Sequence, residues 1–514
     1  MLESLGYSGW VLTFLIFFPA IAAVAVLAGP ERLAKQIAFA LSLLTFIVSI
    51  PLWYGFSQST SAMQYAVQAP WIPQWGISYS VGIDGISLLL VLLTTMLTPI
   101  AILGSYEYIT RREKLFYAMM LLLETGVIGV FCALDLFLFF MFWEIMLIPM
   151  YFIIGIWGGE RRIYAAIKFF LYTASASLLM LVGILYLFFK YHAVTGGMSF
   201  AYADLLQIPL TFTEQYWLFG AFALAFAVKI PIFPFHTWLP DAHVEAPTPG
   251  SVVLAAVLLK LGAYGFLRFL LPLFPHAATN TTIVMIMLVL GTIGIIYAAW
   301  VAAVQPDVKK LIAYTSVAHM GFVVLGIFAL TVQGIQGAII VMLSHGMSTG
   351  AMFLLIGMLY ERRHTRTIAD FGGLAAVAPV FAAMFIFTAF ASIGLPGTSG
   401  FPGEFLALLG TFQTHPYITI IAATGVIFAA YYMLPMVQQV WFNRVERPEN
   451  EKLLDLSRRE LLVIVPLVAV MLWMGFYPKP FLDRSAVTVT DLVETVEMRS
   501  APALGAVGVK GGVR

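Results

Sequence analysis

Long apolar runs separated by short polar segments dominate the chain. Each run has about 20 residues, the length that an α-helix needs to cross the hydrocarbon layer of a bilayer. The pattern predicts an all-α polytopic membrane protein with about 14 transmembrane helices. The expected spans are residues 9–29, 37–56, 86–103, 115–134, 136–157, 167–189, 216–235, 250–271, 282–301, 311–330, 335–359, 377–412, 418–440 and 461–476.

The segments outside these spans carry weaker patterns. Residues 71–80 alternate between apolar and polar side chains, which is typical of a short β-hairpin. Glu3 and no Lys or Arg precede the first apolar run, so a cleaved signal peptide is not expected and the first helix is retained. From Val487 the tail becomes polar and then Gly-rich, so a partly disordered end beyond Ser500 is expected.

Composition supports a lipid environment and excludes several classes of protein. Hydrophobic residues make up 61% of the chain and charged residues 10%, whereas soluble domains average about 25% charged. A net charge of +1 without a basic domain gives no reason to expect a nucleic-acid partner. Cys132 is the only cysteine, so this chain alone cannot form a disulfide, a cysteine-ligated iron–sulfur cluster or a structural zinc site. We therefore expect no metal and no cofactor in it.

The positions of Lys and Arg predict the orientation in the membrane. Cytoplasmic loops are enriched in these residues, and most of the 27 fall in loops of one parity. The opposite loops hold only Lys190 and Arg268, apart from the C-terminal tail. The count therefore places the basic loops in the cytoplasm of a bacterium and both termini on the periplasmic side of its inner membrane. The basic loops contain Arg32, Lys35, Arg111, Arg112, Lys114, Arg161, Arg162, Lys168, Lys309, Lys310, Arg362, Arg363, Arg366, Arg444, Arg447, Lys452, Arg458 and Arg459.

Several ionisable residues lie inside the expected spans. A charge at the bilayer centre costs about 2.5–3.5 kcal/mol on insertion scales. One buried His can be a packing residue, and one Glu–Lys pair can simply join two helices. A whole set of such groups instead favours a shared path for protons or another small cation. The set is Glu124, Glu144, Lys229, Lys260, His319, His345 and Glu404.

Two expected spans are interrupted beside such a residue. The sequence AVKIPIFPF places Pro231 and Pro234 directly after Lys229, and SIGLPGTSGFPGEF places Pro396 and Pro402 before Glu404. Proline removes a backbone donor and clashes with the preceding turn. Carbonyl groups freed inside a membrane need water or neighbouring side chains, so broken helices line cavities, and paired breaks point to a transport site.

The residue types fit proton transfer. A buried Glu144–Lys229 pair would change its protonation state as the two groups separate or approach. Lys260, His319 and His345 can pass protons along ordered water. Arginine cannot, because it does not deprotonate in proteins.

Four sequence segments resemble the antiporter-like membrane subunits of respiratory complex I (NADH-quinone oxidoreductase). They are FWEIMLIPMY around Glu144, KIPIFPFHTWLPDAHVEAPTPGSVVLAAVLLKLGAYG from Lys229, KKLIAYTSVAHMG around His319 and LSHGMSTGAMFLLIG around His345. The likeness extends over residues 82–476. Glu404 resembles the chain M (subunit 4) branch, because the sister chains and the Mrp antiporters usually carry Lys there. DLSRRE at 455–460 and GFYPKPFLD at 475–483 are also similar to that branch.

The resemblance implies a fold and a role. It implies two inverted repeats of five helices each, with broken helices 7 and 12. The expected units are residues 1–110, the repeats 111–272 and 273–443, the last span 444–483, and a tail 484–514. It implies a Glu144–Lys229 pair, Lys260 as connecting residue and Glu404 as outer terminal group of a proton-translocating subunit. The FMN, iron–sulfur clusters and quinone of such a complex would lie in partner subunits, and the neighbours would be other antiporter-like chains and lipid.

Three alternatives remain open at this stage. The first is an Mrp-type sodium/proton antiporter subunit, although Glu404 in place of Lys argues against it. The second is a membrane subunit of a hydrogenase- or ferredoxin-linked complex. The third is a haem b protein that uses His319 and His345 as axial ligands.

Overall fold

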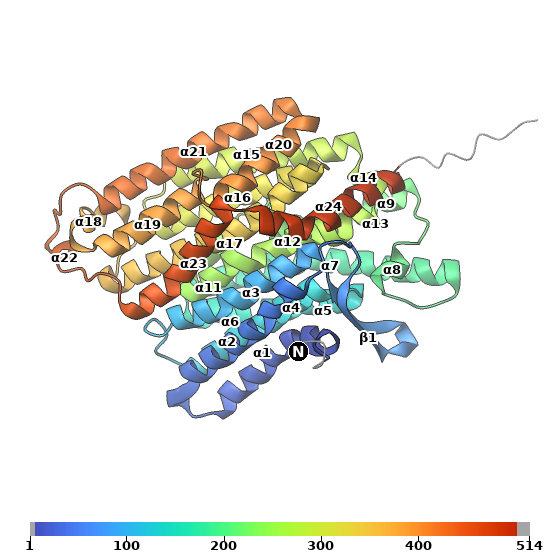
Figure 1. Cartoon of the computed structure of the whole chain (residues 1–514), viewed down its shortest axis with the longest axis horizontal. Coiled ribbons are helices and arrows are strands. Elements are labelled where there is room, and N and C mark those ends of the chain that lie inside the picture. Colours follow the sequence, from blue (N-terminus) through green and yellow to red (C-terminus); the bar gives the residue numbers. More distant parts are fainter. Residues whose placement is uncertain (1–5, 501–514) are drawn as a thin grey trace, which may run out of the picture.

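The chain folds into a bundle of long helices (Figure 1). The computed structural model describes residues 6–500, and twelve helical segments in that part of the chain are long and apolar enough to cross a membrane. This confirms the all-α polytopic class. The segments are α1 (Tyr7–Ala28), η2 with α2 (Glu31–Gly55), α3 (Gly85–Gly104), α4 (Glu113–Cys132), α5 with α6 (Leu136–Trp157), α7 (Arg162–Thr195), α11 to α13 (Thr248–Leu273), α15 (Thr281–Ala303), α16 (Val308–Phe328), α17 (Val332–Arg363), α21 (Pro416–Trp441) and α23 (Arg458–Phe476).

Two of the expected spans do not appear among these twelve segments, and both are interrupted. Residues 216–235 fall on α9 (Phe212–Lys229) and a non-helical connection to α10 (Trp238–Glu245). Residues 377–412 fall on α19 (Pro379–Ser392) and α20 (Gly400–Thr414). The breaks at the seventh and twelfth expected helices are therefore present, whereas the total of about 14 crossings stays a prediction.

Two further helices change geometry inside the bundle. The fifth expected span divides at Met146 into α5 (Leu136–Ile145) and α6 (Leu147–Trp157). Pro149 accounts for this break, because it lacks the N–H that would bond to the carbonyl four residues earlier. The eighth expected span is one helix with two wider π-helical turns. Its parts are α11 (Thr248–Val253), η4 (Leu254–Leu258), α12 (Leu259–Gly265), η5 (Phe266–Leu270) and α13 (Leu271–Leu273).

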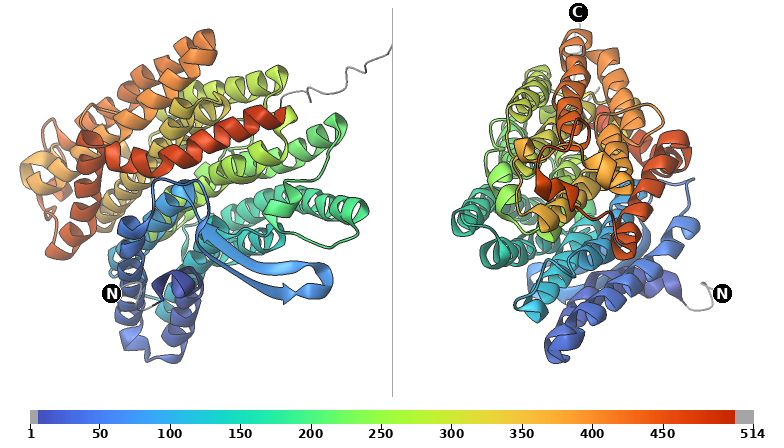
Figure 2. Two further views of the ribbon diagram at one scale, coloured as in Figure 1. Left: turned by 45° about the vertical axis from the view of Figure 1, so that its right-hand side comes forward. Right: turned by 90° about the vertical axis from the view of Figure 1, so that its left-hand side faces the viewer.

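The predicted hairpin is present and longer than expected. Strands β1 (Gln64–Ile72) and β2 (Ile77–Ile83) pair antiparallel and are joined by the turn η3 (Pro73–Trp75). Figure 2 shows the hairpin projecting from the N-terminal part of the bundle. The remaining short elements are α8 (Tyr202–Leu205), α14 (Pro275–Ala278), η6 (Ile368–Asp370), α18 (Leu374–Val377) and α22 (Pro448–Glu451).

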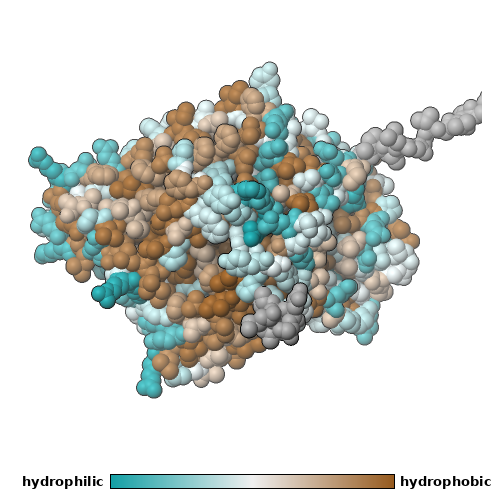
Figure 3. All heavy atoms as spheres, in the orientation of Figure 1, coloured by the Kyte–Doolittle hydropathy of each residue, from teal (hydrophilic) through white to brown (hydrophobic). Residues whose placement is uncertain are grey.

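Burial divides the helices into a central and a peripheral set. The most apolar windows of α11–α13 and α17 are completely buried, whereas that of α2 is only 28% buried. Peripheral helices expose large apolar side chains, such as Ile21 and Val24 on α1 and Ile427 on α21. Figure 3 shows the resulting hydrophobic surface, with hydrophilic residues gathered at the end that carries α18 and α22. Such a surface requires lipid as its solvent.

The segment after the last expected span, up to Ser500, forms a helix. Helix α24 (Lys479–Ser500) crosses the expected boundary at 483/484 and packs against α3 and α17. The backbone N–H of Gly85 donates to Thr488 Oγ1 at 3.1 Å, and Arg499 Nη1 donates to the Pro272 carbonyl at 2.7 Å. These hydrogen bonds tie α24 to the first half of the bundle, and its packing against α17 ties it to the second half. The tail beyond Ser500 lies outside the described residues.

The position of Arg268 differs from the one assumed in the count of Lys and Arg residues, which placed it in a loop. Arg268 lies in the π-helical turn η5, its side chain is 8% exposed, and it forms an ion pair with Asp84. Asp84 also caps α3, because its Oδ1 accepts from the backbone N–H groups of Ile86 and Ser87. A buried arginine beside a carboxylate is neutralised locally, so its position does not contradict the orientation predicted from the other loops.

Candidate functional site

Four of the predicted residues form a row that begins at the end of the first expected repeat and continues into the second half of the bundle. Lys260 lies on α12 between the two π-helical turns, His319 on α16, His345 on α17 and Glu404 on α20. All four are buried, with exposures of 0%, 5%, 3% and 6%. They are up to 144 residues apart in sequence, so only the fold brings them together.

The row begins with Lys260. Its Nζ donates to the Ala255 carbonyl and contacts His345 Nδ1, both at 2.6 Å. Ala255 belongs to η4, and a π-helical turn leaves carbonyl groups outside the usual i to i+4 pattern. The widened turn thus provides an acceptor for a buried ammonium group that contacts no carboxylate in the described part of the chain.

The two histidines continue the row to Glu404. The rings of His345 and His319 are 5.6 Å apart, centre to centre, at 60°. His319 Nδ1 lies 3.0 Å from Glu404 Oε1, and its Nε2 lies 3.3 Å from Ser392 Oγ. If Lys260 donates to Nδ1 of His345, the ring proton of neutral His345 lies on Nε2. Nε2 has no hydrogen-bond partner among residues 6–500, so it is available for transfer.

A small cavity opens between these residues. Its walls include both histidines, Glu404 and the hydroxyl groups of Ser344 and Ser348, and its size suits about one water molecule. The cavity therefore offers a bridge where the two histidines are not directly hydrogen-bonded. The direct ring contact leaves no room for a porphyrin between them, which argues against the haem b alternative.

The break near Glu404 is only partly due to proline. The chain between α19 and α20 contains Pro396 and turns through Gly394 and Gly397, whose φ angles are 72° and 88°. These positive angles favour glycine. Pro402, which was expected to break the helix, is the third residue of α20, where its missing N–H costs nothing. Glu404 thus lies just inside the start of α20.

The first half of the bundle holds Lys229 at the predicted break. Lys229 is the last residue of α9, and Pro231 and Pro234 lie in the connection that follows. The Val228 carbonyl accepts from the Trp238 indole N–H at 2.9 Å, and the Ala227 carbonyl accepts from the Ile232 N–H at 2.9 Å. The break is therefore stabilised by substitute donors, as a helix end inside a membrane requires.

The side chains of Glu144 and Lys229 are near enough to interact electrostatically, but they do not form an ion pair. Lys229 Nζ has no hydrogen-bond partner among residues 6–500 and lies 5.2 Å from the ring centre of Trp143. The Glu144 carboxylate accepts a hydrogen bond from Ser177 on α7. The two charges interact through space, but the structure contains no ion pair between them. The predicted pair is therefore present only as a separated arrangement.

Glu124 stands apart from the other predicted residues. It is buried on α4 beside Thr98, and neither carboxylate oxygen has a hydrogen-bond partner in the described part of the chain. Among residues 6–500 it forms no hydrogen bond or ion pair with Glu144 or with the row.

Sequence reasoning missed two further buried ionisable groups. His243 on α10 stacks on Phe353, with ring centres 4.7 Å apart, and neither of its ring nitrogens has a partner among residues 6–500. Lys309, in the first turn of α16, donates to the Ala246 carbonyl at 2.5 Å. Electrostatic interactions connect His243 with both Lys309 and Lys260. The histidine in DAHVEAP was a visible signal, whereas Lys309 was counted as a loop residue.

Comparisons with known protein families cover most of the chain. Residues 133–429 match the family described as NADH:quinone oxidoreductase/Mrp antiporter, transmembrane region. Residues 11–129 match the amino terminus of NADH-ubiquinone oxidoreductase chain 4.

Individual relatives and solved structures agree with these matches. The chain is 48% identical to NADH-quinone oxidoreductase subunit M of Rhodobacter capsulatus over 500 residues, which is 94% of this chain and 96% of the relative. A chain of respiratory complex I from Thermus thermophilus is similar with a TM-score of 0.85 and 33% identity, covering 94% of this chain and 99% of that one. A chain of the Mrp complex from Dietzia is similar in fold, with a TM-score of 0.80 and 19% identity over 96% of this chain and 99% of that one.

Proposed function

The chain belongs to the NADH-quinone oxidoreductase subunit M family, and on this premise we propose that it moves protons through the row Lys260–His345–His319–Glu404. A member of this family is a proton-translocating, antiporter-like membrane subunit of complex I. The single observation that supports the route is the close sequence of contacts from Lys260 Nζ to Glu404 Oε1. All of these groups can gain and lose a proton.

Transfer along the row would proceed by short steps. Lys260 gives a proton to His345 Nδ1, and the Nε2 proton of His345 passes to His319 across the cavity, directly or through one water molecule. His319 then protonates Glu404, whose carboxylate lies 3.0 Å away. A protonated Glu404 at the start of a broken helix can release its proton toward the outer face.

Glu144 and Lys229 would supply the switch. In the separated arrangement Lys229 lies against Trp143 without an anion, which favours its neutral form, because burial disfavours an uncompensated charge. Closer approach of Glu144 would favour the charged form. Because the two groups are separated, Lys229 can alternate between its neutral form and its charged form as Glu144 moves away or approaches. Glu124 would act as a further buried carboxyl group on the neighbouring helix α4.

The partners follow from the family. We propose that neighbouring antiporter-like chains flank this subunit, and that the FMN, iron–sulfur clusters and quinone reside elsewhere in the complex. We also propose a bacterial inner membrane location with both termini on the periplasmic side. The Mrp alternative shares the fold, but its identity to this chain is 19%, against 48% for subunit M.

Substitution of Lys260 tests the proposed route. Lys260→Ala removes the first proton carrier, so in proteoliposomes that contain the complex this subunit's share of the translocated protons should fall at least about tenfold, the effect expected of one proton-transfer group. Lys260→Arg keeps the charge but cannot deprotonate, and should be nearly as damaging. Lys190→Ala is the control, because Lys190 pairs with Glu214 away from the row. Wild-type translocation by Lys260→Arg would contradict transfer through this residue.

A further inference from the structure

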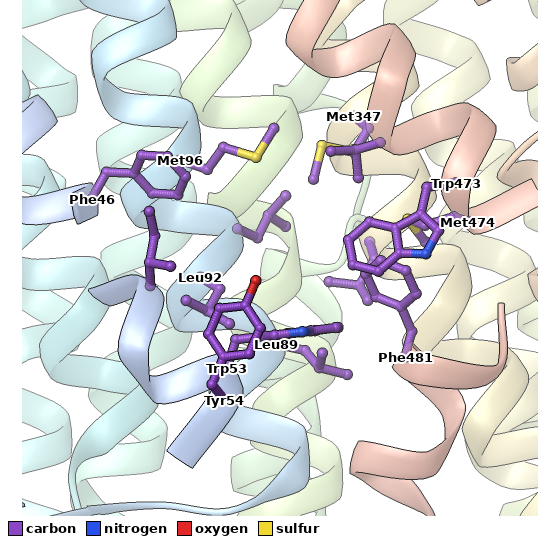
Figure 4. Close-up of a pocket in the computed structure, with 14 residues that line it drawn as sticks. Phe46, Trp53, Tyr54, Leu89, Leu92, Met96, Met347, Trp473, Met474 and Phe481 are labelled. Atoms are coloured by element: carbon purple, nitrogen blue, oxygen red, sulfur yellow. The ribbon is translucent and has the colours of Figure 1, made fainter. Parts of the chain in front are cut away.

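An apolar cavity lies between α2, α3, α17, α23 and the start of α24 (Figure 4). Its volume is about 290 Å³, and none of its lining side chains is charged. In Figure 4, Phe46 and Met96 form one wall and Trp473, Met474 and Phe481 face them. The lining residues of α17 are Leu343 and Met347, whereas the small polar cavity of the proton row uses Ser344, His345 and Ser348. The two cavities are thus separate.

The cavity adjoins the lipid-facing surface. Trp473 is 43% exposed and Tyr54 79% exposed, and both line the cavity. An apolar space of this kind does not hold ordered water, because water needs polar partners. Hydrocarbon is therefore the occupant that matches its walls.

The side chain of Arg484 lies beside the cavity. The guanidinium carbon of Arg484 lies 3.4 Å from the ring centre of Trp53, and Trp53 lines the cavity. Arg484 has no carboxylate within ion-pair distance among residues 6–500. Burial lowers the pKa of Arg484 from its ordinary value, and the charge of the neighbouring Asp483 carboxylate, which pairs with Lys479, offsets this only in part.

The hydrogen bonds of Arg484 leave donors free. Nε and Nη2 donate to the Trp53 carbonyl at 3.3 and 2.9 Å, and Nη1 donates to the Pro480 carbonyl at 2.7 Å. An arginine side chain has five N–H groups. One N–H therefore remains on each terminal nitrogen, the pair of donors that a guanidinium uses to bind phosphate oxygens.

We propose that this cavity binds one acyl chain of an anionic phospholipid, whose phosphate is held by Arg484. Trp53 and Trp473 stand near the ends of their helices, the level at which aromatic side chains meet lipid headgroups. A phospholipid satisfies the apolar walls and the unpaired cation together. A neutral prenyl chain or an apolar segment of a neighbouring subunit would fill the cavity but leave Arg484 without a counter-ion.

Labelling of the unmodified protein tests the occupant. A phosphatidylglycerol with a photoactivatable acyl chain, added to the detergent-purified complex, should cross-link mainly to Met96 and Met347. A tenfold excess of phosphatidylcholine or of inorganic phosphate should not displace it. Cross-linking spread evenly over α1, α7 and α21 would overturn the proposal, and so would a lining residue cross-linked to a neighbouring subunit when a photoreactive amino acid replaces Leu92.

Native mass spectrometry of variants provides the second test. After delipidation and addition of phosphatidylglycerol vesicles, Arg484→Gln should reduce retention of the lipid at least tenfold, and Met347→Trp should abolish it by filling the cavity. Arg499→Gln is the matched control. It lies on the same helix and binds carbonyl groups of Pro272 and Leu206, but it does not line this cavity. Equal retention by Arg484→Gln and the wild type would overturn the assignment of the phosphate site.

Discussion

Lys260, His345, His319 and Glu404 differ in the charge that each carries when it has lost a proton. Lysine and histidine become neutral, whereas Glu404 becomes an anion. The proposed path would therefore end at Glu404, the one group of the four that is negative after it has lost its proton. His319 Nδ1 lies 3.0 Å from that group, within hydrogen-bond distance.

Substitutions of Glu404 distinguish two possible roles of its side chain, which are to bind and release a proton and to form hydrogen bonds at the helix break. Glu404→Gln keeps an acceptor for His319 but cannot bind and release a proton, so this subunit's share of the translocated protons should fall at least about tenfold. Glu404→Lys can still carry one proton and should keep partial translocation. Both are measured by pH-sensitive dye uptake in proteoliposomes. Wild-type translocation by Glu404→Gln would mean that the residue only bonds to the helix break.

Asp84 makes a prediction about stability and pH. Burial alone would raise the pKa of Asp84, but the ion pair with Arg268 and hydrogen bonds from Ser87 outweigh it and lower the pKa. Asp84→Asn leaves Arg268 buried and unpaired, which should cost about 3–5 kcal/mol at neutral pH. Because the folded pKa is lowered, this stabilisation is present above the ordinary aspartate pKa of about 3.9 and is lost as the pH falls below it.

Thermal unfolding in detergent at several pH values measures this effect. The difference between the wild type and Asp84→Asn should shrink as the pH falls below about 4. Asp483→Asn is the control, because Asp483 pairs with Lys479 on the surface and such pairs contribute at most about 1 kcal/mol. Equal melting temperatures for Asp84→Asn and the wild type at pH 7 would show that the pair does not stabilise the fold.

At the scale of elements, the sequence predicted most helices and the two main breaks. Regular apolar runs identified α1 to α4 and α15 to α17 to within a few residues, because each is a single stretch with polar ends. The division at Met146 was missed, although Pro149 was visible, because the apolar run continues through it. The π-helical turns around Lys260 were also missed, since no residue type marks them.

Helix α24 was missed for a different reason. Its sequence is polar enough to read as an exposed tail, but its apolar side chains lie on one face and pack against α3 and α17. That docking depends on partners hundreds of residues earlier in the chain, which local patterns do not reveal. The same limit applies to the site. Sequence identified which residues are buried and ionisable, but not that His319 contacts Glu404 or that Glu144 and Lys229 are separated.

The docking of α24 can be tested with one hydroxyl group. Thr488→Val removes the acceptor of the buried Gly85 N–H, which should cost about 1–3 kcal/mol and accelerate proteolysis of the C-terminal segment. Thr490→Val is the matched control on the same helix, because its hydroxyl donates only to the Ala486 carbonyl. Limited proteolysis and thermal unfolding measure the difference. Identical behaviour of the two variants would mean that the contact with Gly85 does not hold the helix in place.

At the scale of the whole molecule, orientation decides which way protons leave. The loop counts place residues 158–162 in the cytoplasm and the end of α24 in the periplasm. In a Cys132→Ser background, Glu160→Cys should react with a membrane-impermeant maleimide only in inverted vesicles. Ser500→Cys should react only in right-side-out vesicles, and detergent should expose both. Reaction of both cysteines from the same side would show that the number of crossings is wrong.

The central claim is that protons pass from Lys260 to Glu404 through the two histidines, and His319 is the link that no other contact replaces. His319→Gln keeps a polar side chain but removes the titratable ring. The most direct measurement is the number of protons translocated per electron by the reconstituted complex, with His415→Gln as control because His415 contacts Thr414 outside the row. The account predicts that His319→Gln loses this subunit's share of the protons while electron transfer to quinone continues at a measurable rate. A wild-type ratio of protons to electrons in His319→Gln would contradict it.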